Sequence, residues 1–207
     1  MTTLTTLGAQ YFDDMYEQAA DPWGFESRWY ERRKYALTMA LLPRERYRSA
    51  FEPGCSVGVL TSLLAQRCDR LLACDLADAA VAAARERTQD RPNVRVEQGM
   101  IPRDWPAGSF DLIALSEVLY YLGNDDLEHA LRLAIGSLTP GGTIIAVHWR
   151  HPVPEYPRTG DDVHKALAQQ PQLARAVRHR EADFIAEVFT RTDGDAPQSV
   201  AQATGLV

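Results

Sequence analysis

The chain has 207 residues, of which 45% are apolar, and it carries a formal net charge of −6 at pH 7. This length suits one domain with a substantial core, and no apolar run reaches the 18 residues of a membrane-spanning helix. The negative charge argues against a nucleic-acid partner and leaves small neutral or cationic molecules as substrates. The start lacks the basic flank and apolar segment of a secretory signal, so we expect a cytoplasmic protein without membrane contact.

Three cysteines, Cys55, Cys68 and Cys74, are odd in number and lack the spacing of metal ligands. We therefore expect neither a disulfide framework nor a metal site. Cys74 falls in a predicted strand and reads as a buried residue. For Cys55, we favour a small residue tolerated beside a ligand over a nucleophile.

Residues 1–48 precede the first predicted strand and are interpreted as an N-terminal helical lid. A break at Asp21–Gly24 is followed by a predicted helix, Glu26–Leu42, which Pro43 ends. The zone holds more aromatic side chains than short helices need for packing, so we expect some to face a ligand. These are Tyr11, Phe12, Tyr16, Trp23, Phe25, Trp29, Tyr30 and Tyr35.

Residues 49–150 alternate between apolar strand-like runs and helical patterns. This alternation predicts an α/β fold in which a mostly parallel sheet is covered by helices on both faces. The predicted strands are Ser49–Glu52, Leu71–Cys74, Val94–Glu97, Phe110–Ser116 and Thr143–Val147. Predicted helices open at Gly58 and span Ala77–Thr88 and about Asp125–Leu138, and the turn Thr139–Gly142 follows the last of them.

Residues 151–207 are expected to supply a substrate loop and a closing helix and strand. Pro152, Pro154 and Pro157 mark the loop. Helices are predicted at Asp161–Gln170 and Gln172–His179, and a strand at Ala182–Thr190. The pattern of Ser199–Val207 leaves a final strand and a frayed end equally open.

The segment Phe51–Gly58 places glycines on a turn between a strand and a helix, where only glycine gives the backbone free access to positive φ. Asp75 follows Gly54 by 21 residues, the spacing at which an acid accepts hydrogen bonds from a ribose. The dinucleotide fingerprint has three glycines, whereas here Glu52 leads the loop and Ser56 stands in its middle. Because Glu52 would repel a phosphate and attract a cationic amino group, S-adenosylmethionine fits better than NAD.

These motifs, together with Phe110–Ile113 and Leu138–Gly142, resemble those of class I S-adenosylmethionine-dependent methyltransferases over about residues 49–150. More narrowly, Asp21–Trp23, Tyr30–Tyr35 and Ser116–Leu122 resemble the NodS-like branch. That branch is named for the N-methyltransferase that modifies a deacetylated chitooligosaccharide. The resemblance implies a Rossmann-like fold with an N-terminal helical cap and S-adenosyl-L-methionine as the cofactor.

The resemblance also implies roles for eleven residues around the cofactor. Its methionine part would lie against Gly54, Ser56 and Gly58, with Glu52 near its amino group. Asp75 would hold the ribose hydroxyls, Leu76 would touch the adenine, Met100 and Ile101 would cover its other face, and Ser116 would lie under the sulfonium. Trp23 and Arg33 could close over it; for Arg33, pairing with the cofactor carboxylate and a solvated surface position remain equal alternatives.

An amine acceptor must lose a proton before it can be methylated, so a group near the transferred methyl has to accept or relay it. Glu117, after the fourth predicted strand, and His148, after the fifth, are the candidates. A turn cap for Glu117 and a satisfied pocket-edge histidine for His148 are the alternatives. We expect the Tyr120 hydroxyl to reach the acceptor.

The expected activity is methylation of an amino group on a small polar metabolite, with amino sugars and saccharides in mind. One rival is O-methylation of a hydroxylated natural product with His148 as general base. Another is an S-adenosylmethionine-binding protein without catalysis. A nicotinamide-binding fold is disfavoured by Glu52 and Ser56.

Overall fold

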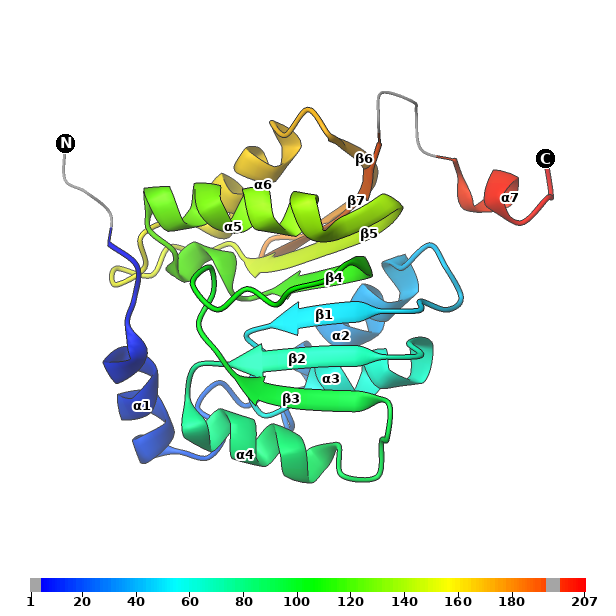
Figure 1. The fold of residues 1–207 in the computed structure, drawn as a ribbon. Coiled ribbons are helices and arrows are strands. Elements are labelled where there is room, and N and C mark those ends of the chain that lie inside the picture. Colours follow the sequence, from blue (N-terminus) through cyan, green and yellow to red (C-terminus); the bar gives the residue numbers. More distant parts are fainter. Residues whose placement is uncertain (1–4, 193–197) are drawn as a thin grey trace.

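The computed structural model describes residues 5–192 and 198–207, and these contain one seven-stranded sheet (Figure 1). Its strand order is β3-β2-β1-β4-β5-β7-β6. The strands are β1 (Ala50–Pro53), β2 (Leu71–Asp75), β3 (Val94–Gln98), β4 (Phe110–Ser116), β5 (Leu138–Trp149), β6 (Leu173–Arg180) and β7 (Phe184–Arg191). Strands β1 to β5 pair in parallel, and β7 pairs antiparallel with β5 and β6. This confirms the predicted mostly parallel sheet.

Helices cover both faces of the sheet (Figure 1). One face carries α5 (Asn124–Ser137) and α6 (Gly160–Ala168). The other carries α2 (Trp29–Leu41), α3 (Val59–Leu64) and α4 (Asp78–Arg87). The remaining helices are α1 (Ala9–Gln18), α7 (Val200–Ala203) and two short 3-10 turns, η1 (Ala65–Arg67) and η2 (Leu119–Tyr121).

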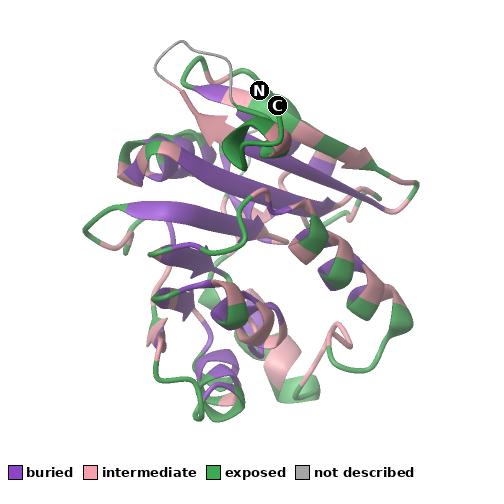
Figure 2. Cartoon of the chain, turned by 90° about the vertical axis from the view of Figure 1, so that its right-hand side faces the viewer, coloured by how far each residue is buried: buried purple, intermediate pink, exposed green. Residues whose placement is uncertain are grey.

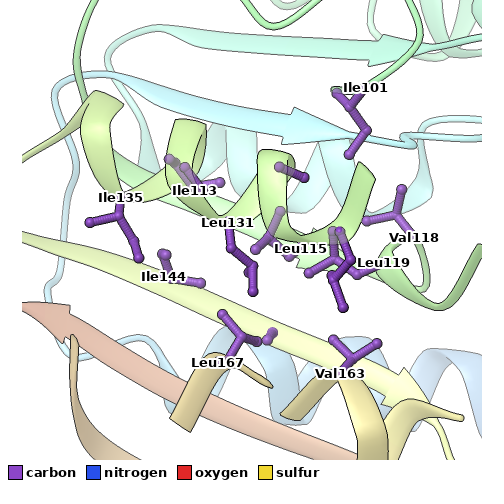
Figure 3. Close-up of a cluster of buried hydrophobic side chains, with 14 of the residues drawn as sticks. Ile101, Ile113, Leu115, Val118, Leu119, Leu131, Ile135, Ile144, Val163 and Leu167 are labelled. Carbon is purple, nitrogen blue, oxygen red and sulfur yellow. The ribbon is translucent and has the colours of Figure 1, made fainter. Parts of the chain in front are cut away.

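Apolar residues in the central strands alternate between the two faces, as successive side chains of a strand must. In β4, Ile113 and Leu115 pack under α5, whereas Leu112 and Ala114 pack toward the opposite layer. Figure 3 shows the first set, where side chains of β4 and β5 meet Leu131 of α5 and those of α6. Both faces of the inner strands are therefore buried, as Figure 2 also shows.

One predicted helix is wrong: Gln172–His179 forms most of strand β6 rather than a helix. Its leucine, alanine and arginine residues favour a helix by intrinsic propensity. In the folded chain, however, the segment pairs along its length with β7, from Leu173 opposite Arg191 to Arg180 opposite Ile185. Pairing with β7, the next strand along the chain, therefore overrides the helical preference of the segment.

Three boundaries also differ from those predicted. The second helix begins at Trp29 rather than Glu26 because the chain still turns after Gly24, where the N–H groups of Ser27 and Arg28 donate to the Gly24 carbonyl and Arg28 is extended. Strand β5 begins at Leu138, so the predicted turn Thr139–Gly142 lies inside an irregular part of that strand. The segment after Ser199 forms the short helix α7 rather than a strand, and residues 193–197 and 1–4 lie outside the described residues.

The parallel strands end together at one edge of the sheet, and α1 lies beside this edge (Figure 1). Glu52, Asp75, Ser116 and His148 all lie at or near these carboxyl ends, as expected. In open α/β sheets this is the edge where ligands bind. None of the helices in the described ranges is both long and apolar enough to span a bilayer.

Candidate active site

A first cavity of about 870 Å³, counting the space open to solvent at its mouth, lies at the carboxyl ends of β1, β2 and β4. Nine of the eleven predicted cofactor residues line it: Trp23, Glu52, Gly54, Ser56, Asp75, Leu76, Met100, Ile101 and Ser116. Two of the eleven, Gly58 and Arg33, do not.

The turn after β1 brings the backbone itself to the cavity wall. Gly54 has a φ of +72°, and a Cβ added there would lie 2.9 Å from Cγ2 of Val118. Ser56 also has a positive φ, of 49°, and its backbone N–H donates to Oδ2 of Asp75 at 2.8 Å. Its hydroxyl lies 2.6 Å from the hydroxyl of Tyr16 in α1. The loop is thus tied both to the end of β2 and to the N-terminal helix.

Gly58 serves the packing of helices rather than the cavity. It has a φ of +78°, and its absent Cβ would lie 2.9 Å from the Cα of Ala84 in α4. This close approach of α3 and α4 explains the glycine without a ligand. The methionine-lining role that the resemblance implied for Gly58 therefore has no support in its position.

We expect Gly58→Ala to lower the free energy of unfolding by about 1–3 kcal/mol, because the new Cβ meets backbone and the residue keeps a positive φ. Cofactor affinity of the folded protein should stay within about threefold of the wild type. Chemical denaturation and titration calorimetry measure the two quantities. Gly136→Ala in α5, where a Cβ meets nothing within 4 Å, is the matched control. Lost binding with unchanged stability would restore Gly58 as a ligand contact.

Asp75 presents a buried carboxylate at the end of β2. Its Oδ2 accepts from the N–H of Ser56 at 2.8 Å and its Oδ1 from the N–H of Ala77 at 3.1 Å. Burial raises the pKa of Asp75, although these two N–H groups oppose the shift. Each oxygen keeps a lone pair, so the carboxylate can still accept from a pair of neighbouring hydroxyls.

Glu52 is the most unusual group in the first cavity. It is 2% exposed, and its Oε2 has no hydrogen-bond partner in the described part of the chain. Burial raises the pKa of this carboxyl to about 8; the nearby hydroxyl of Thr61 opposes the shift and the charge of Asp75 adds to it. A buried carboxylate oxygen without a hydrogen-bond donor is costly, so its presence at a cavity wall indicates a cationic ligand.

Aromatic side chains of the N-terminal zone form part of the wall of the first cavity. Phe12, Tyr16, Trp23, Phe25 and Tyr35 all line it. Trp23 stacks on Phe25 with ring centroids 5.6 Å apart and meets Tyr16 edge-on at 5.7 Å. Several of the aromatics predicted to face a ligand thus do reach the cavity.

Arg33 lies outside both cavities and points toward Glu181. Its guanidinium makes a bidentate ion pair with Glu181, at 2.8 and 2.6 Å, and the side chain is partly exposed. The alternative of a surface position therefore describes Arg33 better than pairing with a cofactor carboxylate.

A second cavity of about 1050 Å³, again counting open space, adjoins the first. Trp23, Phe25, Glu117 and Tyr121 line both. The remaining wall of the second cavity combines aromatic rings with charged groups: Tyr30, Tyr120, Trp149, Tyr156, Arg28, Glu31, Lys34 and Asp183. Glu117 thus lies between the two spaces.

Glu117 occupies a strained position, with a φ of +54°, directly after β4. Its Oε1 accepts from Nζ of Lys34 at 2.6 Å. Its Oε2 accepts from the hydroxyl of Tyr120 at 2.6 Å and from the N–H of Trp149 at 2.9 Å. Three donors hold this carboxylate in one orientation, which makes it an anchor for the second cavity rather than a free base.

Tyr120 lies on the wall of the second cavity, and its hydroxyl donates to Glu117; contact of this hydroxyl with the acceptor stays a prediction. Burial raises the pKa of this hydroxyl well above its usual value, so it stays protonated.

His148 is fully buried and lines neither cavity. Its Nε2 accepts a long hydrogen bond of 3.4 Å from the N–H of Leu119, and its Nδ1 lies 3.1 Å from Nε2 of His164. His164 in turn contacts Glu187 at 2.8 Å. Burial lowers the pKa of His148 well below its usual value, so the ring stays neutral. This placement supports the alternative of a satisfied histidine over a general base.

Sequence reasoning missed the buried pair Glu31 and Lys34 of α2. Nζ of Lys34 lies 2.9 Å from Oε2 of Glu31, and the lysine is 2% exposed. Burial by itself would lower the pKa of Lys34. The negative charges of Glu117 and Glu31 outweigh this effect, so the pKa of Lys34 is raised. The spacing of Glu31 and Lys34 placed both on one helix face. Nothing in the local sequence showed that this face turns inward.

Comparison with known proteins agrees with this geometry. The model of a family described as nodulation protein S (NodS) matches residues 12–157. Nodulation protein S of Bradyrhizobium diazoefficiens is 33% identical over 127 residues, which cover 60% of this chain and 61% of that protein. The matched part thus spans less than two thirds of this curated relative.

Two solved structures extend the comparison. A protein from Pseudomonas syringae classed as a methyltransferase shares 47% identity and a TM-score of 0.71, over 79% of this chain and 100% of that one. The N-methyltransferase NodS from Bradyrhizobium japonicum WM9, solved with S-adenosyl-L-homocysteine, shares 25% identity and a TM-score of 0.80, over 88% of this chain and 97% of that one. The fold is therefore the Rossmann-like fold of class I methyltransferases. Because the family model matches well over half of its residues, the chain belongs to the NodS family.

Proposed function

We propose that this protein is an S-adenosylmethionine-dependent methyltransferase that acts on the amino group of a small polar metabolite, with amino sugars and saccharides as the first acceptors to test. The observation that carries the proposal is the adjoining pair of cavities that meet at Glu117. The likeness to the N-methyltransferase NodS solved with S-adenosyl-L-homocysteine supports it. We also propose a cytoplasmic location and a small-molecule acceptor as the partner.

The residues of the first cavity fit an adenosyl amino acid. The unpaired Oε2 of Glu52 suits a cationic amino group, and the carboxylate of Asp75 suits the two hydroxyls of a ribose. Leu76 and Ile101 offer apolar surface for a flat base. When bound there, S-adenosylmethionine supplies an electrophilic methyl group on a positively charged sulfur.

The protein's part in such a transfer is mainly to align the acceptor and to exclude water. Positive charge is consumed at sulfur and reappears on the methylated amine, so a dry, oriented pocket does most of the work. Trp23 and Phe25 shield the space between the cavities, and Glu117 fixes the wall where the acceptor nitrogen would lie.

The second cavity favours an amine over a hydroxyl acceptor. Its acidic residues, Glu31, Glu117 and Asp183, outnumber Arg28 and Lys34, which suits an ammonium group. The buried hydroxyl of Tyr30 has no partner in the described residues and could bind a polar group of the acceptor. An O-methyltransferase needs a base beside the hydroxyl, and the histidine predicted for that task, His148, faces neither cavity.

Calorimetric titration with S-adenosylmethionine, followed by incubation with isotopically methyl-labelled cofactor and a panel of amines and alcohols, tests the proposal. Mass spectrometry should detect labelled N-methyl product from at least one amine, with amino sugars in the panel. Cofactor binding with no product from any amine would contradict the activity, and product from alcohols alone would favour O-methylation.

We expect Glu117→Gln to lower kcat by roughly tenfold or more while cofactor affinity stays within about threefold. The amide keeps the shape and can still accept from Tyr120, but Lys34 loses one of its two charged partners. Steady-state kinetics and calorimetry separate the two effects. Glu181→Gln, between β6 and β7 where Glu181 pairs with Arg33, is the control. Unchanged turnover in Glu117→Gln would remove Glu117 from the mechanism.

A further inference from the structure

Two carboxylates share one buried lysine on the wall of the second cavity. We call Glu31, Lys34 and Glu117 the charge triad. Nζ of Lys34 lies 2.6 Å from Glu117 and 2.9 Å from Glu31, and the three side chains are 2%, 11% and 8% exposed in the order Lys34, Glu117, Glu31. All three line the second cavity.

The charge triad holds one more negative than positive charge. The other charged groups on this wall, Arg28 and Asp183, have opposite signs and offset each other, and Asp183 is itself about half exposed beside His151. Tyr30 adds no charge, because burial and the nearby acids raise the pKa of its hydroxyl. Since a buried net charge is costly unless it is paired, the space beside the charge triad suits a cation.

The two acids of the charge triad differ in the number of hydrogen bonds that their oxygens accept. Three donors occupy the carboxylate of Glu117. Glu31 meets Lys34 at 2.9 Å, but its Oε2 receives no well-aligned hydrogen bond within the described residues. Of the two, Glu31 is therefore the one that keeps a buried oxygen without a hydrogen-bond donor, in a residue that lines the cavity.

We propose that Glu31 binds the acceptor as an ammonium ion and then takes its proton, which makes it a catalytic residue selective for amines over alcohols. The inference rests on the proposed N-methyl transfer. Lys34 stays protonated, and its role is to hold Glu117 and Glu31 in place.

An ammonium R–NH₃⁺ transfers one proton to the carboxylate of Glu31, which leaves R–NH₂ and a neutral carboxyl group. The nitrogen lone pair then forms the N–C bond while the S–C bond breaks, and that electron pair stays on sulfur. The product R–NH₂–CH₃⁺ carries the charge that sulfur loses, and Glu31 returns its proton to solvent. Burial raises the pKa of Glu31, and Glu117 contributes to the shift while Lys34 and Arg28 oppose it, so Glu31 is a better base than an exposed carboxylate.

A pH profile of Glu31→Gln separates a base from a structural residue. With glucosamine and phenethylamine as probes, we expect kcat/KM at pH 7 to fall about 100-fold. The deficit should shrink as the pH rises toward the pKa of the amine, because free amine then needs no base. Glu31→Asp should retain part of the activity, and Glu181→Gln should match the wild type. A deficit of equal size at every pH, or no deficit, overturns the catalytic role.

Binding without turnover gives an independent readout. In the presence of S-adenosyl-L-homocysteine, the wild type should bind phenethylamine at least about tenfold more tightly than 2-phenylethanol, and Glu31→Gln should remove most of that preference. Equal preference in both proteins contradicts the inference even if amines are methylated. A wild type that methylates no amine contradicts the proposed function and, with it, the proton transfer. The binding comparison then decides only whether Glu31 selects cations.

Discussion

Replacing Glu52 by glutamine is expected to weaken S-adenosylmethionine binding by roughly 100-fold or more and, at the same time, to stabilise the empty protein at alkaline pH. The binding loss follows because an amide cannot neutralise a buried ammonium group, and an unpaired buried charge costs several kcal/mol. The stability gain follows because Glu52 is buried without a partner at Oε2.

The pKa of Glu52 determines how the stability of the empty protein changes with pH. The pKa of Glu52 is about 8 in the folded protein against 4.5 for an ordinary glutamate. The folded state therefore holds a proton that the unfolded state has released, and stability falls as the pH rises from about 4.5 to about 8. Glu52→Gln abolishes this dependence, so its advantage is fully present above pH 8 and is absent below pH 4.5.

Thermal unfolding of the apoprotein at pH 5 and pH 9 measures the effect. A gain of a few kcal/mol at pH 9 corresponds to a rise in Tm of roughly 5–10 °C in a chain of this size. Titration calorimetry in two buffers of different ionisation enthalpy should show that the wild type releases a proton on binding the cofactor and that the variant does not. A variant with wild-type affinity would show that the amino group binds elsewhere.

Asp75→Ala is expected to raise the Kd for S-adenosylmethionine by about 100-fold or more. It removes both acceptors for the ribose hydroxyls, each charge-assisted hydrogen bond being worth about 1.5–3 kcal/mol. It also removes the acceptor of the hydrogen bonds from the N–H groups of Ser56 and Ala77, which destabilises the turn after β1. Calorimetry with S-adenosylmethionine and with methionine separates the two causes.

Asp75→Asn is the matched comparison for this prediction. The asparagine oxygen can accept from one of the two N–H groups, so the turn keeps part of its support and the loss of affinity should be smaller than in Asp75→Ala. Equal affinities in all three proteins would place the ribose away from β2.

Most of the predicted residues around the first cavity could be brought together from the sequence because its elements are local. The turn after β1, helix α3 and the acid at the end of β2 form one β-α-β unit, whose geometry fixes the distance from Gly54 to Asp75. Register between neighbouring parallel strands then brings Ser116 to the same edge. Such spacing depends little on how the rest of the chain packs.

The acceptor side could not be predicted because it depends on the rotation of one helix. Arg33 and Lys34 are neighbours in sequence, but successive residues of a helix point about 100° apart. Lys34 faces Glu117, 83 residues away, whereas Arg33 faces Glu181. No local signal distinguishes the two cations. Strand β6 was missed for a different reason, because its helix-favouring residues are outweighed by hairpin pairing with β7.

Trp23 and Phe25 line both cavities, so a ligand in either one would contact the segment between α1 and α2. We expect the ligand that binds first to restrict these rings and to bear the loss of their conformational entropy, so that the second ligand loses less. Because linkage is reciprocal, the nucleoside should raise the affinity for the acceptor by the same factor as the acceptor raises the affinity for the nucleoside. On this expectation the two pockets are coupled, and an affinity measured for either ligand alone understates the affinity in the ternary complex.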